Sequence, residues 1–457
     1  MSATALLLAA GKGTRMKSRL PKPLQPLLGK PMARYGVDLC RRLGISRVVV
    51  VVGHEAERVR EGLGSDLEYV VQEDPNGTGH AVLAAAALLE DADVPLLVLY
   101  ADNVLLTDET VAALLERQAS TGAACALLTA TPEGPSAYGR VIRGADGSVR
   151  AVVEVKGAPE EIVALREINA GTYVFRSRAL FRALRQVGPD PTTGEIYLTD
   201  VIRYLVEAGE RVETVPAEDP LAALGVNDRV ELAEAAAILR RRILVRHMRS
   251  GVSVEDPATT YVEESVRIGR DTVIRPLTFL SGATVIGEEC EIGPNVRITD
   301  CALGDRVVVH NAVLAESEIG EGTRIGPFAQ VRPGCKIGRK VKIGNFVELK
   351  KATVEDGVSI GHLAYMGDAF IGEKSNIGAG TVTCNYDGKR KHVTRIGRRA
   401  FIGTNNTLVA PVEVGDGAYT AAASVIHEDV PPDALAIGRA RQVNKAGWAR
   451  KRREAEE

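Results

Sequence analysis

Apolar residues follow two different rhythms along this chain, and the first occupies the N-terminal half. Short aliphatic runs, each suited to a buried strand, occur at residues 6–8, 48–52, 67–71 and 96–99. Stretches with helical spacing lie between them, near residues 32–44, 55–63, 79–90 and 108–119. This alternation predicts a doubly wound, mostly parallel α/β sheet. Ligands of such sheets bind beyond the carboxyl ends of the strands.

From about residue 251 the apolar positions recur every six residues. The first series is Ile268, Ile274, Leu280, Ile286, Ile292 and Ile298. The phase is lost around 303–318, and later series contain Ile319, Ile325, Val331, Ile337, Ile343, Leu349, Ile396, Ile402, Leu408 and Val414. Helices have a period of 3.6, and a run of β-hairpins would show a period of two. A period of six predicts a triangular solenoid in which each hexad forms one face.

Two segments differ from both rhythms. Residues 227–249 have helical spacing, and Asn227-Asp228 is a suitable cap, so we expect a linker helix there. Residues 384–395 interrupt the hexads and predict an inserted loop, which is where a rigid scaffold tends to carry function. The expected domains are therefore 1–226, the linker 227–249, and 250–457 with a C-terminal tail from about 437.

Composition narrows the class of protein. The 457 residues are 45% hydrophobic and 25% charged, which is ordinary for a globular protein, and the net charge of −2 argues against nucleic acid or a membrane as partner. Six cysteines form no C-x-x-C pair, which favours reduced thiols over disulfides or zinc. The first residues lack a basic region and cleavage site, and the longest aliphatic run, Val48 to Val52, is too short to span a bilayer. We therefore expect a cytoplasmic protein.

A glycine-rich loop follows the first predicted strand. It covers residues 8–16, and Arg15 with the later Lys22 adds positive charge where a phosphate would lie. Glycines at a strand-to-helix turn also occur for steric reasons alone. The loop is neither a Walker A loop nor a Rossmann fingerprint.

Two further strand ends carry polar groups. Gln72 and Gly77-Thr78 would suit a nucleotide base, because the glycine lets the backbone approach and the amide offers a donor and an acceptor; the alternative is a tight turn with a helix cap. Asp102, in Tyr100-Ala101-Asp102, is placed to hold Mg²⁺, which prefers oxygen ligands. The alternative is a cap on the next helix, but Asp108 suits that role better.

The solenoid carries its own polar cluster. Arg332, Lys350 and Asp368 are eighteen residues apart, one full coil of three hexads, so we expect them in one column, with Arg332 and Lys350 clamping a phosphate. The alternative is a pair of exposed basic residues. His362 lies two hexads after Lys350 and is a candidate general base for an amine that attacks a thioester; the alternative is a structural histidine.

Specific motifs run through both halves. In order they are LAAGKGTRM, LPKPLQPLLGKPM, QEDPNGTGHA, YGRV, VEVKGA, EINAGTYV, GVND, GNFVELKKA, GHLAYMGDA and SNIGAGTVTCNYDG. Together they resemble the bacterial bifunctional N-acetylglucosamine-1-phosphate uridyltransferases/glucosamine-1-phosphate N-acetyltransferases, over essentially the whole chain. The resemblance implies a Rossmann-like nucleotidyltransferase domain followed by a left-handed parallel β-helix. It also implies a homotrimer with Mg²⁺, UTP and acetyl-CoA, which makes UDP-N-acetylglucosamine, a precursor of cell-wall glycans.

The resemblance also implies roles for residues of the first domain. Those expected around UTP and UDP-N-acetylglucosamine are Leu8, Ala9, Ala10, Gly11, Lys22, Gln72, Gly77, Thr78, Tyr100, Ala101, Asp102, Gly139, Glu154, Asn169 and Asn227. Asp102 and Asn227 would ligate Mg²⁺, and Arg15 and Lys22 would act in catalysis. The family usually has Gly-Asp-x-Pro at the metal aspartate, whereas this chain has Ala101-Asp102-Asn103-Val104, so the loop after the carboxylate differs.

In the β-helix the resemblance makes His362 the catalytic base. Residues implied around glucosamine 1-phosphate are Arg332, Lys350, Tyr365, Asn376, Asn385, Tyr386 and Lys391. Those implied around acetyl-CoA are Ala379, Asn385, Tyr386, Thr404, Ala422 and Arg439. Asn385 is also a candidate to orient His362 or the reacting amine.

Two other functions fit parts of the pattern. One is a sugar-1-phosphate nucleotidyltransferase of another specificity with a structural or regulatory β-helix, the layout of ADP-glucose synthases; His362 and the 384–391 loop argue against it. The other is a regulatory subunit that has lost its chemistry. The presence of Arg15, Lys22 and Asp102 argues against that.

Overall fold

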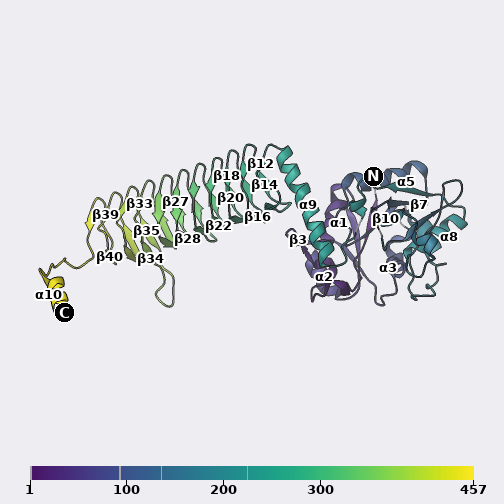
Figure 1. Ribbon diagram of the computed structural model, residues 1–457, viewed down its shortest axis with the longest axis horizontal. Helices are drawn as coiled ribbons and strands as arrows, with labels where there is room; N and C mark the ends of the chain where they lie inside the picture. Colours follow the sequence, from purple (N-terminus) through teal and green to yellow (C-terminus); the bar gives the residue numbers. More distant parts are fainter. Residues whose placement is uncertain (1–2, 92–93, 135, 224, 457) are drawn as a thin grey trace. The chain divides into compact units, whose positions relative to one another are not determined.

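The computed structural model describes residues 3–91, 94–134, 136–223 and 225–456 (Figure 1). The chain divides into two compact units, Met1–Leu239 and Arg240–Glu457. The boundary falls within helix α9 (Arg229–Arg249).

The first unit is built on a mixed sheet. Its strands, in spatial order, are β11 (Val212–Pro216), β7 (Cys125–Ala130), β10 (Ile168–Arg176), β6 (Pro95–Tyr100), β1 (Thr4–Leu8), β4 (Arg47–Val52) and β5 (Glu68–Val71). Only β10 runs antiparallel to its neighbours on this path, and it also pairs with the hairpin β8 (Arg140–Arg143) and β9 (Val149–Val153). The prediction of a mostly parallel sheet is confirmed. The predicted buried strand at 67–71 is wrong in one respect: β5 is the edge strand, and Val71 is 38% exposed.

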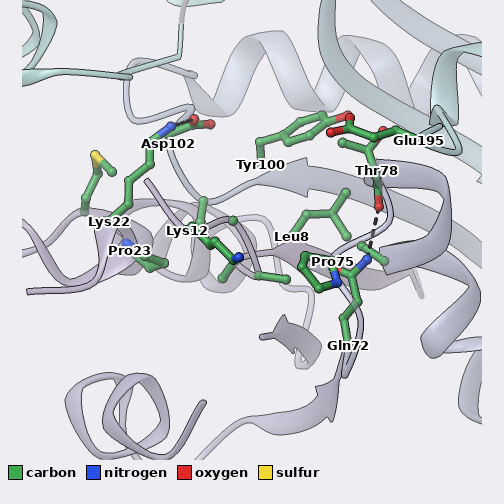
Figure 2. Close-up of a pocket in the computed structure, with 17 residues that line it drawn as sticks. Leu8, Lys12, Lys22, Pro23, Gln72, Pro75, Thr78, Tyr100, Asp102 and Glu195 are labelled. Carbon is green, nitrogen blue, oxygen red and sulfur yellow. Dashed lines mark hydrogen bonds and ion pairs between the residues drawn. The ribbon is translucent and has the colours of Figure 1, made fainter. Parts of the chain in front are cut away.

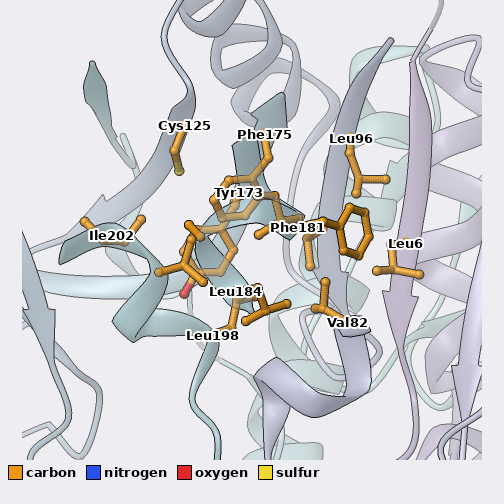
Figure 3. Close-up of a cluster of buried hydrophobic side chains, with 14 of the residues drawn as sticks. Leu6, Val82, Leu96, Cys125, Tyr173, Phe175, Phe181, Leu184, Leu198 and Ile202 are labelled. Atoms are coloured by element: carbon orange, nitrogen blue, oxygen red, sulfur yellow. The ribbon is translucent and has the colours of Figure 1, made fainter. Parts of the chain in front are cut away.

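Helices cover both faces of this sheet, as a doubly wound fold requires. Val48, Val50 and Val52 pack on one side with residues of α1 (Met32–Arg42), α2 (Ala56–Leu63) and α5 (Asp108–Thr121). Val49 and Val51 pack on the other side with residues of α3 (Thr78–Ala84), α4 (Ala86–Leu89), α7 (Ser177–Leu184) and α8 (Val201–Glu207). Figure 3 shows part of this second cluster, including Leu6, Val82 and Leu184. Successive residues of a strand point to opposite faces, so continuous aliphatic runs mark strands buried on both sides. The short elements are η1 (Thr14–Met16), η2 (Lys22–Leu24), β2 (Pro26–Leu27), β3 (Lys30–Pro31), α6 (Glu160–Val163), η3 (Leu198–Asp200) and η4 (Pro220–Ala223).

The starts of two helices bear on the site. The cap of α5 is Thr107, whose side chain accepts a hydrogen bond from Thr110 N, so the expectation that Asp108 caps this helix is wrong. The Asp108 carboxylate instead accepts a hydrogen bond from the Arg42 guanidinium. Helix α9 begins after Asp228, whose carboxylate accepts from the N–H groups of the second and third helical residues at 2.8 and 3.0 Å. This cap fixes the chain immediately after Asn227.

The second unit is a left-handed parallel β-helix, drawn in Figure 1 as a regular stack of coils. Within residues 240–456 its strands form three parallel sheets, which run from β12 (Ser253–Val254) to β41 (Leu435–Ala436), from β13 (Tyr261–Val262) to β40 (Val425–Ile426), and from β14 (Arg267–Ile268) to β38 (Val412–Val414). One inward column, each member at most 2% exposed, contains Ile274, Ile292, Val309, Ile325, Ile343, Ile360, Ile377 and Ile402. The six-residue period therefore marks the core of the prism.

The stack continues through residues 303–318, where the hexad phase is lost. Ile298 pairs with Leu314, sixteen positions later, whereas a coil of three full hexads has eighteen residues. The shortened coil loses residues at its corners and keeps its strands in register. Close coil contacts limit the side chains allowed: a Cβ on Gly326, at φ +107°, would collide with the carbonyl oxygen of His310.

The predicted inserted loop is confirmed. It joins β34 (Val382–Cys384) to β35 (Thr394–Ile396), projects from the stack (Figure 1), and is closed by an antiparallel bridge between Tyr386 and Lys391. All six cysteines are free thiols, five buried and Cys384 exposed, as expected from their spacing. In the described part of the chain, no helix is long and apolar enough to cross a membrane.

Candidate active sites of the two units

The first unit holds a cavity of about 460 Å³ at the carboxyl ends of β1 and β6 (Figure 2). Predicted residues that line it are Leu8, Ala9, Ala10, Gly11, Lys22, Gln72, Gly77, Thr78, Tyr100, Ala101 and Asp102. Sequence reasoning did not single out the other lining residues, which are Lys12, Pro23, Met32, Pro75, Ala81 and Glu195. Three separate predicted segments thus meet at one site, the edge where an α/β sheet binds ligands.

The sheet itself holds the glycine-rich loop and the segment from Gln72 to Thr78 in place. Ala9 N donates to Val51 O at 2.8 Å, and Ala101 N donates to Leu8 O at 3.0 Å. Gln72 is 5% exposed, and its Nε2 donates to Gly77 O at 3.2 Å. Gly77, at φ +91°, has no room for a Cβ against the main chain of Ile196. The strand ends therefore bring the backbone of both loops to the cavity wall.

A charged cluster lies at one end of the cavity. Lys22 Nζ forms an ion pair with Asp102 Oδ2 and donates to Asn227 Oδ1 at 3.1 Å (Lys22 and Asp102 are labelled in Figure 2). Arg15 donates to the same Asn227 oxygen at 2.9 Å. Asp102 O accepts from Val226 N at 3.1 Å, and Asn227 N donates to Glu231 Oε2 at 2.6 Å. Main-chain contacts and the start of α9 thus hold the predicted metal ligands side by side.

These residues fit a magnesium ion. A carboxylate oxygen of Asp102 and the amide oxygen of Asn227 both contact one cation, the Lys22 ammonium, so the two oxygens converge on a single point. No group of three or more His, Cys, Asp or Glu side chains suited to a metal occurs among the residues that the structure describes. Mg²⁺ is commonly bound by one or two protein oxygens together with substrate phosphates and water, which matches so small a ligand set.

The residues implied for the sugar form a neighbouring group. Asn169 N donates to Gly139 O at 2.8 Å, and Glu154 Oε1 accepts from Thr199 Oγ1 at 2.9 Å. Burial raises the pKa of Glu154, while the Thr199 hydrogen bond opposes this shift. None of Gly139, Glu154 and Asn169 lines the cavity described above. They lie together beside it, and the Glu154 charge acts on Tyr100 in the cavity wall.

Two positions that the sequence left without a role support the charged cluster. Asn103 is 6% exposed and donates to Ala170 O at 3.2 Å and to Thr172 Oγ1 at 3.3 Å, which ties the Asp102 loop to β10. Tyr138 OH accepts from Gly225 N at 2.7 Å, and burial raises the pKa of Tyr138 to about 12. Tyr138 is the first residue of the YGRV motif, although sequence analysis assigned it no role. No sequence signal indicated the contacts of Asn103.

In the β-helix, one column contains His362 and three of the six residues predicted around acetyl-CoA. His362 ends β30 (Ser359–His362), and the strand registers, continued by two residues, place Ala379, Thr404 and Ala422 on the next three coils. Asn405 N donates to Ala379 O and Ala423 N to Thr404 O, both at 2.7 Å, which confirms the stacking. Arg439 lies at the end of the stack. The residue before it, Gly438, accepts a hydrogen bond at its oxygen from Val425 N at 3.0 Å. The column offers His362 a row of small residues on one side.

The basic residues implied for the sugar phosphate also come together. Arg332 N donates to Leu349 O at 2.9 Å, which places Arg332 beside Lys350 on adjacent coils. The ammonium of Lys391, from the inserted loop, lowers the pKa of Lys350. Like charges held this close favour a bound anion. Of the other implied residues, Tyr365 lies beside Glu348, Asn376 lies beside Ser359, and Tyr386 pairs with Lys391.

One expectation for this cluster is wrong, and another is wrong in one of its two alternatives. Lys350 pairs with Gly367, so Asp368 stands one position beyond the column, because the coil between them has seventeen residues. The Asn385 amide bonds to the Asp368 carboxylate, whereas His362 Nδ1 bonds to Asn345 Oδ1. Of the two alternatives for Asn385, the structure contradicts orientation of His362, because the imidazole contacts Asn345, a residue that the sequence did not single out. A role of Asn385 on the reacting amine stays a prediction.

Comparisons with known proteins match both units. The nucleotidyl transferase family model covers residues 4–220, and the bacterial transferase hexapeptide model (six repeats) covers residues 316–351. The bifunctional protein GlmU of Geobacillus sp. (strain WCH70) is 50% identical over 97% of this chain and 97% of its own. That of Exiguobacterium sp. (strain ATCC BAA-1283 / AT1b) is 50% identical over 99% of this chain and 100% of its own. A solved UDP-glucose pyrophosphorylase complexed with UDP-glucose is 19% identical, with a TM-score of 0.43, over 53% of this chain and 100% of its own. The chain belongs to the family of the bifunctional protein GlmU.

Proposed function

We propose that the cavity of the first unit transfers UMP from UTP to N-acetylglucosamine 1-phosphate, and that the His362 column acetylates glucosamine 1-phosphate with acetyl-CoA. The chain is an enzyme, a uridyltransferase and acetyltransferase by its family. One observation carries the assignment to sites: each unit separately gathers a charged cluster from distant segments, around Asp102 in one and around Lys350 in the other. We further propose domains at 1–226, 227–249 and 250–457, and a place in the cytoplasm, which six free thiols support.

Uridyl transfer at the cavity is an in-line displacement. An oxygen of the sugar phosphate attacks the α-phosphorus of UTP, and the bond to pyrophosphate breaks. The attacking phosphate is already ionised, so no protein base is needed. Mg²⁺ held by Asp102 and Asn227 would offset phosphate charge. Arg15 and Lys22 supply positive charge at the same point, and the main chain of the 8–11 loop and Gln72 orient the nucleotide.

Acetyl transfer at the β-helix needs a base. The amine nitrogen of glucosamine 1-phosphate attacks the thioester carbonyl carbon, and His362 removes the proton that this nitrogen must lose. The C–S bond then breaks, and the departing sulfur of coenzyme A takes a proton. Arg332, Lys350 and Lys391 hold the sugar phosphate, while the small residues of the column leave room for the thioester.

We also propose that the protein is a homotrimer through its β-helix. Phe328, Phe346 and Leu363 are 57%, 55% and 59% exposed on successive coils, and all three adopt positive φ, which side chains of this size avoid. Phe328 and Phe346 stack at 5.5 Å. Leu363 follows His362, so an adjoining protomer on this column would lie beside the acetyl-transfer site. An exposed apolar column of this kind favours a second copy of the chain as its partner.

Sedimentation equilibrium tests the trimer. The wild-type protein should have the mass of three chains, and Phe328→Gln combined with Phe346→Gln should shift the mass toward one chain, because both changes place polar groups in the contact. Val313→Gln, at an apolar position that is 45% exposed on a strand face, is the matched control and should remain a trimer. A monomeric wild-type protein would contradict the proposal.

The pKa of Glu154 gives a pH prediction for uridyl transfer. Because burial raises this pKa, Glu154 takes up its proton at a higher pH than an exposed glutamate, and the neutral acid is a weaker acceptor for sugar hydroxyls than the carboxylate. We expect kcat/KM for N-acetylglucosamine 1-phosphate to decline on the acid side at a pH above the usual carboxyl range. Glu154→Gln should lower kcat/KM and remove this decline, leaving only that of the substrate phosphate. Identical acid limbs in both proteins would refute the role of Glu154.

A paired assay tests the proposed function as a whole. One tube contains glucosamine 1-phosphate and acetyl-CoA, and free thiol is followed. The other contains N-acetylglucosamine 1-phosphate, UTP and Mg²⁺, and pyrophosphate is followed. Product is expected in both tubes. Pyrophosphate without thiol would assign the β-helix a structural role only.

A further inference from the structure

Asn345 is a polar residue of the β-helix to which the chemistry above gives no task. It ends β27 (Lys342–Asn345), and the parallel register places it directly opposite His362 on the next coil. Its Oδ1 forms a hydrogen bond with His362 Nδ1, and its main-chain oxygen accepts from Leu363 N at 3.0 Å. Asn345 therefore holds both the imidazole and the backbone that carries it.

The chemistry of the amide decides which ring nitrogen carries the proton. The Asn345 amide turns its oxygen toward the ring, and an amide oxygen can only accept, so we assign the N–H group to Nδ1. In a neutral imidazole with its proton on Nδ1, the free lone pair lies on Nε2. The hydrogen bond thus leaves Nε2 as the atom that can take a proton from a substrate amine.

The backbone around Asn345 brings the two side chains together. A Cβ on Gly344 would collide with the carbonyl oxygen of Gly361, so these coils can approach this closely only with glycine at 344. The residue after Asn345 is anchored in turn, because Phe346 N donates to Phe328 O at 3.0 Å. On the opposite side of His362, the column continues with Ala379, a small residue. Asn345 thus contacts the imidazole from the preceding coil. On the side of Ala379, where we propose that the thioester binds, the next coil presents only a small side chain.

We propose that Asn345 is a positioning residue for acetyl transfer, which fixes the ring orientation and the Nδ1-protonated tautomer of His362. The proposal rests on the proposed role of His362 as general base. Asn345 should therefore affect the chemical step of acetyl transfer and not the binding of its substrates.

The test compares two substitutions of Asn345 in the full-length protein. Asn345→Leu keeps the size of the side chain and removes the acceptor, so kcat for acetyl transfer should fall about 10- to 100-fold, as for loss of an outer-shell partner, with each KM within about threefold. Asn345→Asp keeps an acceptor oxygen and should retain kcat within about threefold of wild type. Its kcat/KM profile should rise at a higher pH than that of the wild type, because a carboxylate stabilises the imidazolium.

Controls separate positioning from folding and from the role of His362 itself. Uridyl transfer by the same preparations should be unchanged, and Gln330→Leu, at an exposed amide on a strand of a different sheet of the β-helix, should keep acetyl transfer. The proposal is overturned if Asn345→Leu keeps its kcat, or if Asn345→Asp is as inactive as Asn345→Leu. His362→Ala is assayed in parallel: if it retains acetyl transfer, the base assignment fails and this proposal fails with it. If only His362→Ala is inactive, the base assignment stands and Asn345 has no positioning role.

Discussion

Replacing Asp102 by alanine is expected to lower uridyl transfer at least about 10³-fold, because stabilisation of charge at the reacting phosphates contributes strongly to catalysis. The substitution removes the carboxylate that pairs with Lys22, leaving that ammonium without its ion-pair partner. It also removes one of the two oxygens that converge on the proposed Mg²⁺ position. Pyrophosphate release measures the loss. Acetyl transfer, followed by free thiol, should remain at the wild-type rate.

Asp108→Ala is the matched control for this prediction. Asp108 lies six residues further along, at the start of α5, and its carboxylate binds the exposed Arg42. Asp108→Ala should leave uridyl transfer unchanged. If Asp102→Ala retained a tenth of the wild-type rate, or if acetyl transfer fell with it in a folded protein, the assignment of Asp102 would be wrong.

Replacing His362 by alanine should have the opposite effect. General-base catalysis contributes about 10²- to 10⁴-fold, so acetyl transfer should fall by that factor while uridyl transfer is unchanged. The loss should appear in kcat, because the phosphate of the sugar is still held by Arg332, Lys350 and Lys391. Release of free thiol from acetyl-CoA at saturating substrates is the measurement.

His310→Ala is the matched control, because His310 follows a strand of the same sheet as β30, which His362 ends. His310 follows β21 (Val308–Val309) and bonds to Glu291 at 2.8 Å, outside the run of His362, Ala379, Thr404 and Ala422. It should keep both activities. Acetyl transfer by His362→Ala within about threefold of wild type would exclude the histidine as base, since such a change is far below the contribution of a general base.

The six-residue period predicted the architecture of the second unit because the inward position is physically demanding. Each face of the prism must bury an aliphatic side chain such as Ile343 or Ile360, and a polar residue without a hydrogen-bond partner there would destabilise the core. The same logic identified the inserted loop, since most of residues 384–395 contribute nothing to the buried columns. In the first unit, the continuous run Val48 to Val52 predicted a buried strand for a similar reason.

The register between successive coils of the β-helix could be predicted less accurately than its buried columns. The sequence argument assumed eighteen residues in each coil, and it therefore aligned Asp368 with Lys350. Coils can lose residues at their corners without disturbing the buried column, so the pairing of Lys350 with Gly367 shows only in the structure. The contact between Asn345 and His362 was missed for the same reason, because they are seventeen residues apart.

Contacts between distant segments were also beyond the sequence. The antiparallel insertion of β10 between β6 and β7 leaves no periodic signal, yet it places Ala170 where the buried Asn103 amide can reach it. The sequence marked the segment Ala101-Asp102-Asn103-Val104 as a departure from the family's Gly-Asp-x-Pro pattern. Its structural consequence, a tie between the proposed metal-binding loop and β10, depends on strand order.

A mixing experiment tests most directly the claim that the two units carry separate, complete active sites. Asp102→Ala and His362→Ala proteins are purified separately and then combined with glucosamine 1-phosphate, acetyl-CoA, UTP and Mg²⁺, and UDP-N-acetylglucosamine is measured. Each protein alone should make almost none. The mixture should make it at a rate comparable to that of the wild type, because one protein supplies the acetylated intermediate and the other consumes it. Failure of the mixture, with each variant still active in its own remaining half-reaction, would contradict the account of two independent sites.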